Sequence, residues 1–170
     1  MAKKIETKAD LKNLALFYCS KRETSRLRLE RYLERKCREN ELSQPGWIEE
    51  ILVDFENRKI VDDHRYSEII VREYARRGKG KRYIEQKLKE KGIRGDLLKF
   101  ETNSADEALR AQELALKHFE KLERRLGRFS ALDPKEAYSF KQKILQKLIQ
   151  SGFDVDTSRV ALEKSLKAQK

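Results

Sequence analysis

The chain has 170 residues and carries 40 Lys and Arg against 29 Asp and Glu, a formal net charge of +11, with only seven Gly and two Pro. This composition, rich in residues that lose little side-chain freedom in helices, predicts an all-α protein. It excludes a membrane-spanning segment, since no apolar run approaches ~18 residues, and a disulfide framework, since the two Cys are isolated and no secretory signal is visible; we therefore expect a cytoplasmic protein with no membrane partner.

Residues 8–57 are predicted to form a first three-helix unit. Its first helix runs from about residue 10 to 20, and Thr24 is expected to cap the second. The third begins near Pro45, which suits a first helical turn. Apolar residues three or four apart mark the buried faces of the last two helices: Leu29, Leu33 and Cys37, then Ile48, Ile51, Leu52 and Phe55.

Residues 60–100 are predicted to form a second unit. Asp62 is expected to cap its first helix, which ends before Gly78, and the next helix ends at Gly92-Ile93, a typical left-handed stop. A short helix is expected over residues 96–100. The predicted buried residues of the two longer helices are Tyr66, Ile69, Ile70, Tyr74, Ile84 and Leu88.

Residues 104–168 are predicted to form a third unit. Ser104 with Glu107 is read as a capping box that opens a long helix ending at Gly127, and Asp133-Pro134 with Glu136 opens the next. The last helix follows Gly152-Phe153. Predicted buried residues are Ala108, Ala111, Ala115, Phe119, Leu122 and Leu126, then Ala137, Ile144 and Leu148, and finally Val160, Ala161 and Leu166.

An internal repeat links the second unit to the third. At an offset of 60 residues, six of the thirteen positions from Lys81 to Ile93 are identical, among them Ile84/Ile144, Leu88/Leu148 and Gly92/Gly152. About one match is expected by chance. We therefore predict three tandem three-helix repeats stacked into an elongated, curved array, which acts as a monomer because no long apolar seam is left exposed.

Positive charge gathers at two places. On the second predicted helix, four arginines share one face over about 15 Å: Arg28, Arg31, Arg35 and Arg38. Residues 72–94 hold ten Lys and Arg against three acids, a local net charge of +7. Six of these cations bracket a glycine turn and are expected to be solvent-exposed: Arg72, Arg76, Arg77, Lys79, Lys81 and Arg82. Both surfaces could bind phosphates or acidic side chains. The alternative for the arginine helix is a solvated face whose arginines pair with Glu, and the alternative for the glycine turn is a mobile basic turn.

No motif predicts catalysis or a cofactor. The sequence lacks a phosphate loop, a dinucleotide fingerprint and a nucleophile motif, so we expect a non-enzymatic binding protein. Asp62, Asp63 and His64 would be the residues of a metal-dependent hydrolase, but no second cluster with metal-ligand spacing accompanies them. Helix capping explains Asp62 more economically.

The central segment resembles that of the RecX family. Three motifs carry the resemblance: Ile60-Val61-Asp62-Asp63-His64-Arg65-Tyr66, then Gly78-Lys79-Gly80-Lys81-Arg82-Tyr83-Ile84, then Leu88-Lys89-Glu90-Lys91-Gly92-Ile93. Ser67 stands where the family usually has Ala. The flanking segments 22–33 and 144–153 also resemble the family, so the likeness covers nearly the whole chain, whereas residues 128–133 and the long helix before them depart from it.

This resemblance implies a regulator that lodges in the groove of a RecA–DNA filament. Such a protein inhibits ATP hydrolysis, strand exchange and filament extension by RecA, and thereby modulates DNA repair, recombination and the SOS response. Direct binding to single- or double-stranded DNA is also implied. The alternative is a sequence-tolerant nucleic-acid-binding helical protein that acts without RecA.

Overall fold

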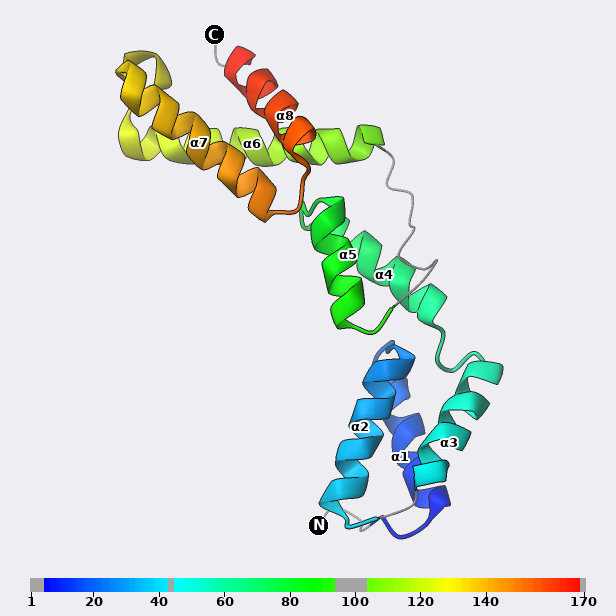
Figure 1. The fold of residues 1–170 in the computed structure, drawn as a ribbon. Coiled ribbons are helices and arrows are strands. Elements are labelled where there is room, and N and C mark those ends of the chain that lie inside the picture. The colour runs from blue at the N-terminus through cyan, green and yellow to red at the C-terminus, as the bar shows by residue number, and fades with distance from the viewer. Residues whose placement is uncertain (1–4, 43–44, 94–103, 169–170) are drawn as a thin grey trace. The chain divides into compact units, whose positions relative to one another are not determined.

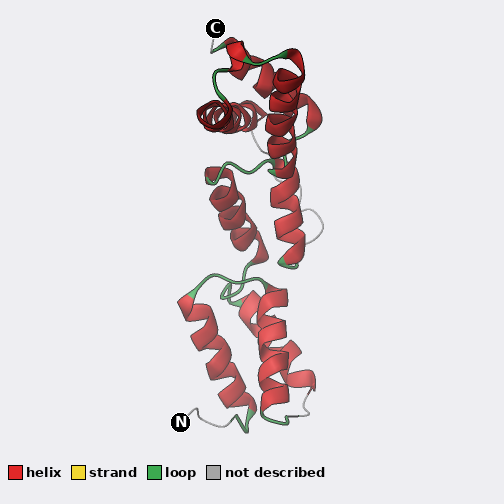
Figure 2. Cartoon of the chain, turned by 90° about the vertical axis from the view of Figure 1, so that its left-hand side faces the viewer, coloured by secondary structure: helices red, strands yellow, loops and turns green. Residues whose placement is uncertain are grey.

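The computed structural model describes residues 5–42, 45–93 and 104–168 of the protein. Over these residues it contains eight α-helices, a single 3-10 turn and no strand, which confirms the all-α prediction (Figure 2). In the described segments no helix combines the length and apolarity needed to cross a bilayer. The expected short helix over 96–100 lies outside the described residues.

The chain divides into two compact units, one of residues 1–69 and 88–99 and the other of residues 70–87 and 100–170. In the first unit, α2 (Arg26–Glu39) packs against both α1 (Lys8–Lys21) and α3 (Pro45–Asn57), and the three helices lie side by side (Figure 1). Their shared core includes most of the predicted positions: Leu29, Leu33, Cys37, Ile51, Leu52 and Phe55, joined by Leu11 and Ala15 of α1.

The start of α2 differs from the prediction. Ser25, not Thr24, is the N-cap: its side chain accepts from the N–H of Arg28 at 3.4 Å, and its hydroxyl donates to the carbonyl of Lys91 at 2.5 Å. Thr24 is buried instead. Both residue types are good caps, so the contact with Lys91, 66 residues away, is what distinguishes them.

The boundary between the units passes through α4 (Asp63–Arg76) and α5 (Lys81–Glu90). Tyr66, Ile70, Ile84 and Leu88 are buried as predicted. Ile69 is not, since 37 % of it is exposed. Successive residues of a helix point about 100° apart around its axis. Ile70 points into the core, and Ile69 therefore points partly towards solvent.

Asp62 lies just before α4 and caps it as predicted. Its Oδ1 accepts from the N–H of Arg65 at 3.1 Å and from that of His64 at 3.0 Å. The Arg65 hydrogen bond is the largest cause that holds the pKa of this carboxyl below its usual value, with Lys59 nearby as a further one. The ionised form is therefore favoured in the folded chain.

We expect Asp62→Ala to lower the free energy of unfolding by about 0.5–2 kcal/mol at neutral pH, because two helix N–H groups lose their acceptor. Since folding lowers the pKa, this stabilisation is present above the unfolded pKa of about 3.9 and is lost as pH falls through the folded value. Denaturant unfolding of both proteins between pH 7 and 3 checks this. A stability difference that persists unchanged at pH 3 would contradict it.

The second unit is built mainly on α6 (Ser104–Leu126), which packs against both α7 (Pro134–Gln150) and α8 (Val155–Lys167). The rings of Phe119 and Phe140 meet at 5.0 Å in its core, and Phe129, in the 3-10 turn Phe129–Ala131, covers them. The predicted capping box of Asp133 and Glu136, with Pro134 in the first turn, is confirmed. Leu126 and Val160 are 41 % and 49 % exposed, contrary to their predicted burial.

Five helices end in the same way. The second residue after the helix adopts a positive φ, and the next N–H bonds back five residues, for example from Ile93 to Leu88 at 3.0 Å and from Phe153 to Leu148 at 3.3 Å. Glycine supplies the positive φ at 78, 92 and 152, as expected. Glu41 and Lys59 supply it at the ends of α2 and α3, where the sequence holds no glycine signal.

Candidate functional site

The backbone of the basic turn between α4 and α5 is held in place by another turn. The N–H groups of Gly80 and Arg82 donate to the carbonyls of Ser151 and Gly152, in the α7–α8 turn, at 2.9 and 3.1 Å. The N–H of Lys81, at the start of α5, donates to the Glu107 carboxylate at 2.8 Å. Three hydrogen bonds therefore anchor the backbone of this turn.

Glycine makes this anchoring possible. A Cβ on Gly80 would lie 2.5 Å from backbone atoms of Gly152 and Phe153, and one on Gly152 would lie 2.4 Å from the backbone N of Tyr83. Backbone atoms cannot move aside as a flexible side chain can. The identity of Gly80 and Gly152 thus follows from the close approach of the two turns.

The six predicted cations of this turn differ in their surroundings. Arg72, Arg76, Arg77, Lys81 and Arg82 are exposed as expected. Lys79 is half-buried, contrary to expectation, because its ammonium lies 4.6 Å from the centre of the Tyr83 ring. That ring meets Tyr74 edge-on at 5.5 Å. Arg77 pairs with Glu73 at 2.5 Å and lies over the Tyr74 ring, so part of the predicted charge is used within the turn.

Three cations of the turn form no ion pair with a described residue: Arg76, Lys81 and Arg82. They flank the anchored backbone, and no acidic side chain of the described residues competes with an anion for them. We define these three as the basic turn set.

The α2 arginines are also unequal. Arg31, Arg35 and Arg38 are exposed, whereas Arg28 is half-buried and donates from Nη1 to the Tyr66 hydroxyl at 2.9 Å. This hydrogen bond is the largest cause that raises the pKa of Arg28. Arg35 pairs with Glu39 at 3.6 Å. Arg28 therefore has a structural contact. Arg31 and Arg38 are the arginines of this face that are exposed and form no ion pair with a described residue.

The acidic pair before α4 has structural roles. Asp62 caps α4, and the Asp63 carboxylate accepts from the N–H of Arg26, the first residue of α2, at 2.8 Å. Burial raises the pKa of Asp63, although the Arg26 hydrogen bond opposes this. His64 is exposed and lies 3.5 Å from Glu68. Over the described part of the chain, no three His, Cys, Asp or Glu side chains are placed to hold a metal ion.

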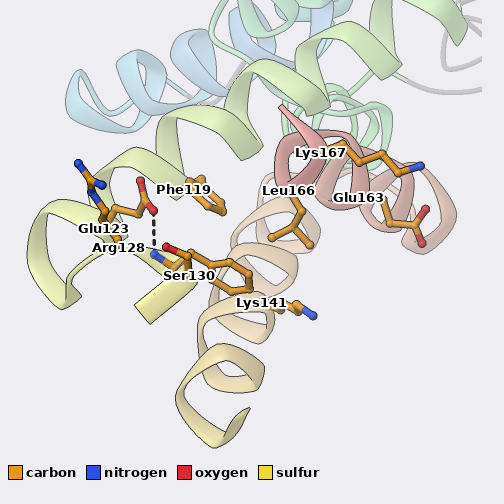
Figure 3. A pocket seen from close by; sticks show the side chains of 9 residues that line it. Phe119, Glu123, Arg128, Ser130, Lys141, Glu163, Leu166 and Lys167 are labelled. Carbon is orange, nitrogen blue, oxygen red and sulfur yellow. Dashed lines mark hydrogen bonds between the residues drawn. The ribbon is translucent and has the colours of Figure 1, made fainter. Parts of the chain in front are cut away.

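A pocket of about 780 Å³ that the sequence did not predict opens among α6, the 3-10 turn, α7 and α8 (Figure 3). Phe119 and Leu166 give it an apolar wall, and Glu123 and Glu163 stand among the cations of its rim. The Glu123 carboxylate accepts from the N–H of Phe129 at 2.8 Å. Charges of both signs compensate here, so this pocket has no clear preference for an anion.

The fold and these surfaces define a class: a basic, all-helical protein whose open cations stand on an anchored turn and on a helix face. Residues 62–99, which contain that turn, match the family model described as RecX, second three-helix domain. The resemblance to the RecX family is thereby confirmed, since this segment of the chain is similar to that domain.

Relatives extend this likeness to most of the chain. The chain is 29 % identical over 153 residues to the regulatory protein RecX of Lactococcus lactis subsp. cremoris (strain MG1363), which covers 89 % of this chain and 54 % of that protein. It is 29 % identical over 146 residues to the regulatory protein RecX of Streptococcus uberis, covering 85 % and 51 %. The chain thus spans about half the length of the curated relatives it matches.

Solved structures share the fold. A crystal structure of RecX from Lactobacillus salivarius superposes with a TM-score of 0.73 at 24 % identity, covering 93 % of this chain and 96 % of that one. A second crystal structure of a regulatory protein RecX gives a TM-score of 0.70 at 22 % identity, covering 92 % and 73 %. Helical architecture is therefore common to this chain and to these RecX proteins.

Proposed function

We propose that this chain is a non-enzymatic regulator that binds the RecA–DNA filament and inhibits RecA, limiting ATP hydrolysis, strand exchange and filament extension. The observation that carries the proposal is the basic turn set, which stands on an anchored backbone inside the segment that matches a RecX domain. The relatives are named regulatory proteins, which supports a regulatory role for this chain.

The physical argument is electrostatic complementarity. A RecA–DNA filament presents DNA phosphates, and positive side chains attract such a surface over a Debye length of about 8 Å at physiological salt. A turn whose backbone is already fixed loses little conformational entropy on binding. Arg76, Lys81 and Arg82 satisfy both conditions, whereas Arg77 must first give up Glu73.

We propose that the three segments 8–57, 60–100 and 104–168 are tandem three-helix repeats, stacked as an elongated, curved monomer without a cofactor. Action on a RecA–DNA filament would place the chain in the cytoplasm.

The test is RecA ATPase activity on single-stranded DNA with the protein titrated in. Replacing Arg76, Lys81 and Arg82 together by Ala should raise the concentration needed for half-inhibition about tenfold or more and lower its dependence on salt, because each lost phosphate contact removes about one unit of the salt slope. Helical content and melting temperature should stay the same, since all three side chains are exposed.

A matched variant replaces three exposed lysines elsewhere by Ala: Lys117, Lys135 and Lys164. It removes the same net charge and should inhibit almost normally. If the turn variant inhibits like the parent at every salt concentration, the turn is not the contact surface. The α2 face is then the next candidate, through Arg31 and Arg38.

A nucleic-acid-binding protein that acts without RecA is the second candidate, favoured by the same exposed cations. Equal affinity for bare and RecA-coated DNA, with no effect on the ATPase, would support it over the first.

A further inference from the structure

A second hollow of the second unit, of about 680 Å³, lies between α6 and α7 and differs in charge from the pocket of Figure 3. Its lining contains five cations and His118, and no carboxylate. The cations are Lys121, Arg124 and Arg125 of α6 and Lys143 and Lys147 of α7. We call this hollow the α6–α7 groove.

No acidic side chain in the described part of the chain neutralises the charge of the groove. None of its five cations forms an ion pair with a described acidic residue, whereas Arg35 and Arg77 of the predicted surfaces pair with Glu39 and Glu73. Like charges held this close repel one another and favour a bound anion. A ligand that carries negative charge is therefore the expected occupant.

The cations stand in two rows. On α7, Lys143, Gln146, Lys147 and Gln150 all line the groove at helical spacing, so they form a polar row about 10 Å long, in which the two lysines are about 6 Å apart along the axis. On α6, Lys121 and Arg125 line the opposite side. One strand of B-DNA has a phosphate for each ~3.4 Å of axis, so a row of this length suits several consecutive phosphates better than a single small anion.

The other lining residues argue against a protein partner. Leu122 is the one aliphatic residue among them, and the lining has no Phe, Tyr or Trp. Protein interfaces depend on buried aromatic or aliphatic anchors, and base recognition in single strands uses aromatic stacking. The groove offers neither, which leaves contacts to the sugar-phosphate backbone.

We propose that the α6–α7 groove binds the phosphodiester backbone of a nucleic acid, independently of base sequence. None of the residues that line the groove belongs to the basic turn set, and the proposal does not depend on RecA inhibition. It assigns a binding role to the part of the chain where the resemblance stated from the sequence is weakest.

His118 supplies a reporter inside the groove. Burial is the largest cause that lowers its pKa, and Lys147 of α7 and Lys121 and Arg125 of its own helix lower it further. A phosphate bound among these cations offsets their effect, so the pKa of His118 should rise on binding.

The binding test is fluorescence anisotropy of the full chain with a labelled single strand of about 20 nucleotides and with its duplex, in the absence of RecA. Replacing Lys121, Lys143 and Lys147 together by Gln should weaken binding about tenfold or more. The salt slope should fall by about 2 units for the single strand and about 3 for the duplex. The form of nucleic acid whose affinity falls by the larger factor is the one that the groove prefers.

The matched control replaces Lys117, Lys135 and Lys164 by Gln, three exposed lysines that line neither pocket. It changes the net charge equally and should alter affinity less than about twofold. If both triple variants lose affinity to the same extent, binding depends on net charge alone and the groove is not a site. Unchanged binding by the groove variant overturns the proposal equally.

NMR gives a second readout, because the chain has only two histidines. Titration with and without the oligonucleotide should show that the pKa of His118 rises on binding, and the ring signals of His64, which is on α4 beside Glu68, serve as an internal reference. If the groove variant loses RecA inhibition while His118 of the parent protein shows no response to DNA, the groove binds a protein surface and not a nucleic acid. Normal DNA binding without RecA inhibition would refute the proposed function and leave this inference intact.

Discussion

Replacing Gly152 with Ala should lower the free energy of unfolding by about 3 kcal/mol and detach the basic turn from its support. Gly152 has a φ of +92°, which costs an L-residue about 1–2 kcal/mol. The added Cβ would also meet the backbone of Tyr83 at 2.4 Å, and overpacking of this kind costs about 1–3 kcal/mol more. Thermal and denaturant unfolding measure the loss.

Gly127 provides the matched control, because it has a φ of +95° but nothing within 4 Å of the position of its Cβ. Gly127→Ala should therefore cost only the conformational part, about 1 kcal/mol. The difference between the two variants isolates the close approach of the turns. Equal losses would show that Gly152 and Tyr83 do not approach as closely as the structure has them.

The same substitution also tests the anchoring of the basic turn. The hydrogen bonds from Gly80 and Arg82 end on the carbonyls of Ser151 and Gly152, and displacement of either turn breaks them. Amide hydrogen exchange at Gly80 and Arg82 should therefore accelerate in Gly152→Ala and stay normal in Gly127→Ala. An unpinned turn pays more entropy on binding, so inhibition per folded molecule should also weaken.

Leu88→Asp should give the other large loss of stability, about 4 kcal/mol or more. Leu88 is 0 % exposed, and removal of a buried Leu side chain alone costs about 2–5 kcal/mol. The new carboxyl would lack a hydrogen-bonding partner of its own and would have to stay protonated, which raises the cost at neutral pH. Unfolding followed by circular dichroism at pH 7 measures the effect.

The neighbouring residue on α5 serves as the control, since Lys89 is exposed. Lys89→Asp makes the same new residue one position along and should cost less than about 1.5 kcal/mol, because the side chain stays in water and only helix propensity and the charge at the end of α5 change. Near-native stability of Leu88→Asp would mean that the carboxylate reaches water. The burial of this face of α5 would then be refuted.

Several features of the fold followed from the sequence, because short-range chemistry determines them. Asp62 before α4 and the Asp133-Glu136 box before α7 satisfy N–H groups within three residues. Gly92 and Gly152 stop their helices because glycine adopts a positive φ without cost. The apolar spacing likewise predicted the buried faces of α2, α3 and α7, since helical periodicity alone places such residues on one side.

The tertiary structure decided what depends on residues far apart in the chain. Ser25 caps α2, although Thr24 is an equally suitable residue type, because the Ser25 hydroxyl donates to the carbonyl of Lys91. The Glu107 carboxylate accepts from the N–H of Lys81, which belongs to a different helix. Lys79 was predicted to be exposed, but its ammonium packs over the Tyr83 ring. Long-range packing determines these contacts, and the residue pattern of a single helix does not reveal them.

The candidate surfaces divide in the same way. The sequence indicated the α2 face and the basic turn as places where cations gather, since helical spacing and local charge density are properties of neighbouring residues. It did not find the α6–α7 groove, whose cations are spread over residues 121–147 and meet only when the two helices pack. Nor did it show which cations are neutralised, because ion pairing depends on the rotamers of both partners as well as on their spacing. Composition made this a basic helical protein, and helix packing determined where its unpaired charge converges.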